Sequence, residues 1–170
     1  MAGGSMAKPT TYATPICIGL SILAMIGIIL GWLNHNALIL IILLLPAVIY
    51  EIYRTEGEST KWASWVMLIV ILAEIWFIWK NVSFDLANYF GTSEQYVGGF
   101  WVPLGDIKII APIVMAVLSG ILFFRTNGKY TKWLAVIIFV SAGVAVYIIN
   151  PEIIKTMLPV IIQQGLNRYY

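Results

Sequence analysis

The sequence is poor in charged residues, cysteine and histidine. Only 11% of its 170 residues are charged, about half the share found in soluble domains, and the net charge is +2. Because the few charges are scattered and form no basic run, nucleic acid is not an expected partner. The single cysteine, Cys17, excludes an internal disulfide, and the single histidine, His35, excludes a bis-histidine haem site within one chain.

The motifs of common enzymes are also missing. The sequence contains no GxSxG, HExxH or P-loop pattern and no cluster of metal ligands. Apart from Glu74, the carboxylates fall at the ends of apolar segments or in loops, so no pair of acids is placed for hydrolysis. We therefore expect a protein that is not an enzyme and that uses no cofactor and no metal.

Apolar residues are abundant instead. Hydrophobic residues make up 61% of the chain, and the mean hydropathy is +0.90. They form five blocks of roughly 18 to 22 residues, the length that a helix needs to cross a hydrocarbon core about 30 Å thick. A soluble fold would have too few remaining residues to cover five buried helices. The sequence therefore predicts an all-α, polytopic integral membrane helical bundle with five transmembrane helices.

We expect the chain to divide into three parts. Residues 1–12 are a tail whose start, MAGGSMA, resembles an expression-tag remnant. Residues 13–149 are the five-span membrane domain, with an external loop at 81–106. Residues 150–170 are an amphipathic interfacial helix, which begins with an asparagine cap and a proline and is too short to cross the membrane. The expected spans are Ala13–Leu33, Ala37–Tyr53, Lys61–Trp79, Ile107–Phe124 and Lys132–Ile149.

A nine-residue pattern occurs twice. RTEGESTKW at 54–62 recurs as RTNGKYTKW at 125–133, and each copy joins two expected spans. In each copy a glycine suits a left-handed helix cap, a threonine suits the N-cap of the next helix, and a lysine and a tryptophan suit the membrane interface. Each copy therefore predicts a tight helical turn. The repeat arose either by convergence on one turn or by duplication of a two-helix unit.

Both turns lie on one membrane face because two spans separate them. Lys and Arg number six on that face and four on the other, so the positive-inside rule places the turns in the cytoplasm. We therefore expect a cytoplasmic N-terminus and an external C-terminus, in the plasma or inner membrane of a prokaryote. The six are Lys8, Arg54, Lys61, Arg125, Lys129 and Lys132, and the four are Lys80, Lys108, Lys155 and Arg168.

Glu74 is the acid placed inside an expected span. It lies about 9 Å along the helix axis from Lys80, and an ionised carboxylate facing lipid there is costly. It is either an ion or proton site or a buried polar contact between helices, with Ser119 or Tyr147 as partner. Glu51 lies one helical turn before Arg54, and this spacing predicts a local ion pair between them at a helix end.

The external loop is the candidate recognition segment. Residues 83–90 suit a short interfacial helix, and the glycine-hinged apolar run that follows suits a re-entrant turn or a docking surface. The candidate docking residues are Gly98, Gly99, Phe100, Trp101 and Pro103.

Two function classes remain. The first is a non-catalytic accessory or scaffold subunit of a larger transporter or other membrane complex. The alternative is a small homo-oligomeric ion channel or a proton- or ion-coupled transporter that uses Glu74. The expected partners are the lipid bilayer and either other membrane subunits or further copies of this chain.

Overall fold

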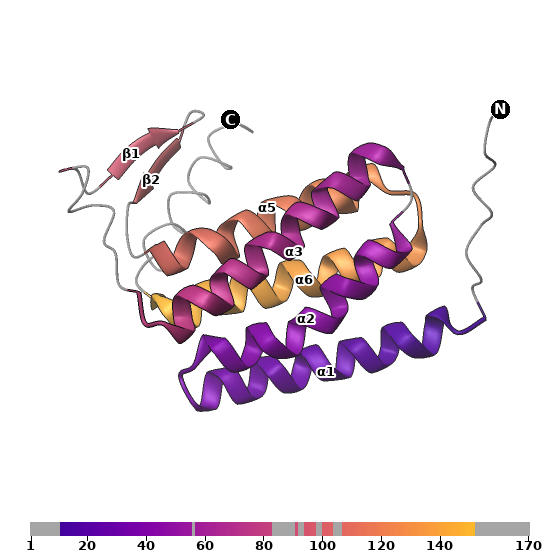
Figure 1. Ribbon diagram of the computed structural model, residues 1–170, viewed down its shortest axis with the longest axis horizontal. Helices are drawn as coiled ribbons and strands as arrows, with labels where there is room; N and C mark the ends of the chain where they lie inside the picture. The colour runs from indigo at the N-terminus through magenta and orange to yellow at the C-terminus, as the bar shows by residue number, and fades with distance from the viewer. Residues whose placement is uncertain are drawn as a thin grey trace, which may run out of the picture.

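A computed structural model describes residues 11–55, 57–82, 91, 94–97, 100–103 and 107–151. In that part of the chain, five α-helices lie side by side in one bundle (Figure 1). Four of them are long and apolar enough to cross a membrane, namely α1, α2, α3 and α6. The shorter α5 follows a 3₁₀ turn, η1. The bounds are α1 Ala13–Leu33, α2 Ala37–Arg54, α3 Glu58–Trp79, η1 Ile107–Ile109, α5 Ile110–Arg125 and α6 Lys129–Ile149.

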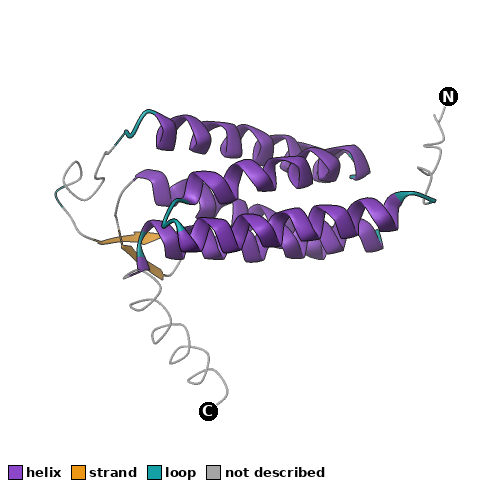
Figure 2. Ribbon diagram, turned by 90° about the horizontal axis from the view of Figure 1, so that it is seen from below, coloured by secondary structure: helices purple, strands orange, loops and turns teal. Residues whose placement is uncertain are grey.

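Four helices form a ring in the order α2, α3, α5, α6, each packed on the next, and α1 packs across α2 and α6 (Figures 1 and 2). Side-chain hydrogen bonds also join α1 to α6. Trp133 Nε1 donates to Ser21 Oγ at 3.0 Å, and the hydroxyls of Thr14 and Tyr130 lie 2.9 Å apart. The α2–α3 and α5–α6 turns lie together at one end of the bundle, which we call the turn end.

The bundle is apolar both inside and outside. Leucine, isoleucine, valine and methionine fill its centre, with Leu44, Met67 and Ile138 each at most 1% exposed. Its outer surface also carries large apolar side chains, such as Ile69 and Val117. A helix that is hydrophobic all round belongs in a large core or a membrane. This pattern confirms the prediction of a helical bundle and indicates a multi-pass membrane protein.

The two turns share most of their hydrogen bonds. The hydroxyls of Thr60 and Thr131 donate to the carbonyls of Gly57 and Gly128, at 3.0 and 2.8 Å. The threonines are therefore not the N-caps that the sequence analysis expected, because the glycines take that position. As a result α3 and α6 begin three residues earlier than predicted. Neither glycine takes the expected left-handed C-cap conformation, since Gly57 combines φ 102° with ψ 135° and Gly128 has φ −73° and ψ 128°.

The α2–α3 and α5–α6 hairpins are equivalent beyond the repeated nonapeptides. At an offset of 71 residues, ten positions are buried in both hairpins, whereas α2 and α6, which also pack on α1, bury further positions such as Leu40, Ala47 and Leu134 whose counterparts are only partly buried. Because one turn geometry fixes the register of both flanking helices, this equivalence follows from convergence as well as from duplication. The buried pairs are Ile41/Pro112, Leu44/Met115, Val48/Ser119, Glu51/Leu122, Thr55/Thr126, Thr60/Thr131, Ser64/Ala135, Met67/Ile138, Ile71/Ala142 and Glu74/Ala145.

A short β-hairpin extends the fold beyond the all-α prediction. Strands β1, Glu94–Val97, and β2, Phe100–Pro103, pair antiparallel, with Val97 opposite Phe100. They lie at the end of the bundle opposite the turns, which we call the hairpin end (Figure 1). The expected interfacial helix at 83–90 and residues 152–170 of the expected C-terminal helix lie outside the described residues.

Candidate functional site

Glu74 lies on the inward face of α3. The buried residues of this helix, Thr60, Ser64, Met67, Ile71 and Glu74, recur at alternating spacings of four and three residues, so they form one stripe. The Glu74 side chain is 1% exposed. Neither of its carboxyl oxygens has a hydrogen-bond partner within the described part of the chain.

Ser119 and Tyr147 do not form the expected polar contact with Glu74. The Ser119 hydroxyl donates to the carbonyl of Ala116 in its own helix, at 2.8 Å. The Tyr147 ring stacks on Trp32 of α1, with 5.1 Å between the ring centroids. Glu74 lies about 8 Å from the hairpin end of α3 and Ser119 about 9 Å from the turn end of α5, so they occupy opposite halves of the bundle.

A second buried acid, Glu51, forms a polar cluster at the turn end. Thr55 Oγ1 donates to Glu51 Oε1 at 2.6 Å, and Ser64 Oγ donates to Oε2 at 2.7 Å from the neighbouring helix α3. The expected ion pair with Arg54 is thus replaced by two hydroxyl donors. The guanidinium of Arg54 lies instead over the Tyr130 ring, 5.0 Å from its centroid. The buried Glu51 carboxylate thus takes one of its two hydrogen-bond donors from Ser64, which is 13 residues away in the sequence.

Two hollows at the hairpin end share His35, whose backbone has φ 48°. The larger, about 240 Å³, also borders Lys108, which donates from Nζ to Asn81 Oδ1 at 3.1 Å. Glu74 lines neither hollow. Within the described ranges, no three His, Cys, Asp or Glu side chains gather as they would around a metal ion. The lining residues of the larger hollow are His35, Asn36, Ala37, Ile78, Lys108, Ile148 and Ile149, and those of the smaller are Trp32, His35, Tyr147, Ile148 and Pro151.

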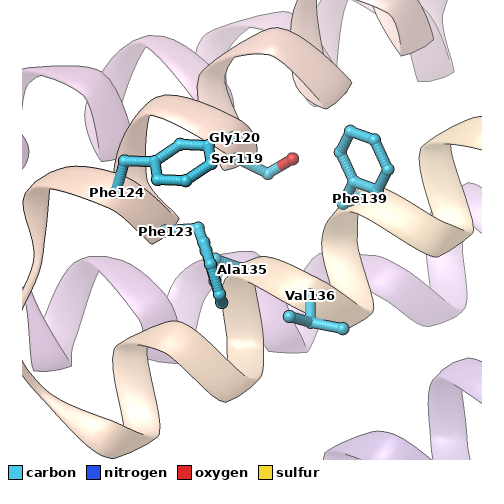
Figure 3. A pocket seen from close by; sticks show the side chains of 7 residues that line it. All are labelled: Ser119, Gly120, Phe123, Phe124, Ala135, Val136 and Phe139. Carbon is cyan, nitrogen blue, oxygen red and sulfur yellow. The ribbon is translucent and has the colours of Figure 1, made fainter. Parts of the chain in front are cut away.

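A third hollow is an apolar cleft of about 190 Å³ on the flank of the bundle, between α5 and α6. Figure 3 shows the side chains around it, with Phe123 and Phe124 from α5 and Val136 and Phe139 from α6. This cleft was not predicted from the sequence, because the aromatic side chains that form it belong to two different expected spans.

The candidate docking residues belong to the β-hairpin. Phe100, Trp101 and Pro103 are part of β2, and Gly98 and Gly99 lie outside the described residues, between the two strands. A Gly-Gly pair between two short runs that contain aromatic and β-branched residues is a signal for a two-residue β-turn. The β-hairpin could therefore have been predicted from the sequence in place of the expected glycine hinge.

Comparison of the chain with protein-family models, with curated proteins and with solved structures finds no match in any of the three. The fold and the site therefore define a class only. That class is a multi-pass membrane helical bundle with two buried acids, Glu51 with two hydroxyl donors and Glu74 without a donor in the described part.

Proposed function

We propose that this chain is a non-catalytic integral membrane subunit of a larger transporter or other membrane complex. It crosses the bilayer five times, and residues 150–170 lie along the surface as an amphipathic helix. The fourth crossing consists of η1 and α5 together, because Ile107–Arg125 spans about 30 Å, the thickness of the hydrocarbon core. The chain carries out no reaction of its own.

The distribution of cations supports a cytoplasmic turn end. Arg54, Lys61 and three cations of the second turn lie there, while Lys80 and Lys108 lie at the hairpin end. Under the positive-inside rule the N-terminus is cytoplasmic and the β-hairpin external, which suits the inner membrane of a prokaryote.

The observation that carries the subunit proposal is the enclosure of Glu74. An ion or proton conductor needs a polar path or a wetted constriction through the membrane. Between the levels of Glu51 and Glu74, the inward positions of α2 and α3 are apolar, as at Leu44, Val48 and Met67. The buried polar side chains of α5 and α6 at these levels are the hydroxyls of Ser119 and Ser141, and neither is charged. Glu74 also borders none of the three hollows described above. A closed bundle with an apolar exterior suits a protein that packs against another membrane protein.

One observation favours the alternative, a proton- or ion-coupled homo-oligomer. Neither Glu74 oxygen has a partner among the described residues, and an acid within a membrane is a functional-site hypothesis by default. In that case the bundle must open, since Glu74 is sealed in this arrangement.

Reconstitution of the purified full chain in liposomes separates the two functions. We expect proton and potassium permeabilities equal to those of empty liposomes, and a detergent-solubilised mass of one chain. A flux that Glu74→Gln abolishes, or a closed ring of copies, would overturn the subunit proposal in favour of the alternative.

Cross-linking in the native membrane tests the subunit role directly. A photoreactive residue at Val117, which is exposed on α5, should give one defined adduct with a different membrane protein. Adducts with lipid alone, or with a second copy of the chain, would contradict the proposal.

A further inference from the structure

The cleft between α5 and α6 opens sideways rather than into the bundle core. Phe124, Val136 and Phe139 line it and are each more than two-fifths exposed on the flank. Its interior is apolar, since the hydroxyl of Ser119 is engaged with the Ala116 carbonyl. At Gly120 there is unfilled space, because a Cβ added there would meet no atom within 4 Å.

This cleft lies close to the turn end. Its lining residues on α5 are all within about 9 Å of Arg125 along the helix axis, which is less than half the thickness of a bilayer core. Lys132 Nζ lies 5.6 Å from the centroid of the Phe123 ring, which is part of the lining. A cation is therefore placed where the apolar cleft meets the membrane surface.

The second turn is purely basic, whereas the first is not. RTNGKYTKW carries Arg125, Lys129 and Lys132 and no acid, while RTEGESTKW balances two cations with Glu56 and Glu58. The first hairpin also has Trp65 at the position of Val136 and Ser64 at that of Ala135. The apolar cleft and the unbalanced positive charge thus occur together in the second hairpin.

We propose that this cleft binds an anionic phospholipid of the leaflet at the turn end. One acyl chain lies in the cleft against Gly120 and the phenylalanine rings. The phosphate is bound by Lys132, with Arg125 and Lys129 adding to the local positive potential. An anionic headgroup is favoured over a zwitterionic one because juxtamembrane cations attract net negative lipids.

Native mass spectrometry of the full chain with added phosphatidylglycerol or phosphatidylcholine tests the headgroup part. We expect one phosphatidylglycerol molecule to be retained in preference to phosphatidylcholine. Lys132→Gln should weaken that binding roughly five-fold, the effect of one cation near a membrane surface. Lys61→Gln, the equivalent change in the first turn, should leave it unchanged. Equal retention of both lipids, or equal effects of the two substitutions, would overturn the proposal.

A second pair of variants tests the acyl-chain part. Gly120→Leu fills the cleft and should abolish phosphatidylglycerol retention. Gly143→Leu places the same side chain at an exposed and equally open glycine of α6 that does not line the cleft, and should have no effect. If Gly120→Leu leaves lipid retention intact, or dissociates a dimer instead, the cleft is not a lipid site.

Discussion

The hydroxyl of Ser64 on α3 donates a 2.7 Å hydrogen bond to Oε2 of Glu51 on α2. In the second hairpin, Ala135 and Leu122 occupy the equivalent positions, and both are buried. Next to the turn that connects the two helices, one hairpin therefore has a polar pair of buried side chains and the other has an apolar pair. This difference means that the turn itself does not require the acid.

Removing Ser64 alone should destabilise the protein. Ser64→Ala leaves a buried Glu51 oxygen without its donor, which costs about 1 to 3 kcal/mol. The double variant Glu51→Leu/Ser64→Ala reproduces the apolar pair of the second hairpin and should recover most of that loss. Unfolding in a fixed detergent, monitored by circular dichroism, gives both values. A double variant that is less stable than Ser64→Ala would show that the acid contributes more than its hydrogen bonds.

Glu74 should respond to substitution differently from Glu51. It is buried, but no described side chain donates to it, so Glu74→Leu removes a costly polar group and leaves no donor unpaired. We expect a stability equal to or above that of the wild type in the same unfolding assay. A loss of more than about 1 kcal/mol would reveal a donor that Glu74 needs in the folded protein.

The sequence predicted the helices well because their signals are local. Asn36 caps α2 through Oδ1, which accepts from the Leu38 amide at 3.0 Å, and the predicted start at Ala37 is confirmed. The ends of α1 are those predicted. By contrast, the partner of Glu51 could not be predicted, since two polar residues 13 apart meet only when the intervening turn brings their helices together. Counting residues along the two expected spans, however, places Ser119 and Glu74 at different depths in the membrane. Ser119 could therefore have been excluded as a partner of Glu74 from the sequence.

Close packing of α1 on α2 depends on Gly27. A Cβ added there would lie 3.0 Å from the Cβ of Leu43, whereas one added at Gly19 of the same helix would meet no atom within 4 Å. Gly27→Leu should therefore force the two helices apart and lower stability by about 1 to 3 kcal/mol, the usual cost of overpacking. Gly19→Leu is the matched control and should be neutral or stabilising, since leucine favours a helix more than glycine does. Equal effects at both positions would contradict the close approach.

Membrane topology can be tested with single cysteines in a Cys17→Ala background, because Cys17 is the only native thiol and is buried. Gly57 and Gly128 are poor positions for a labelled cysteine. Gly57 has φ 102°, which a residue with a side chain rarely adopts, and a Cβ at Gly128 would lie 2.7 Å from Thr131 Oγ1. Exposed neighbours serve better, with Lys61→Cys and Asn127→Cys reporting on the two turns. Lys80→Cys, which is also exposed, reports on the hairpin end.

With a membrane-impermeant maleimide on intact cells, we expect Lys80→Cys to be labelled and both turn cysteines to be protected until the membrane is opened. The turn cysteines must behave alike, since both turns lie at one end of the bundle. Labelling of the turns but not of position 80 would reverse the orientation and leave the fold intact. Different labelling of the two turns would contradict the fold itself, because α3 and α5 could not then both cross the membrane between them.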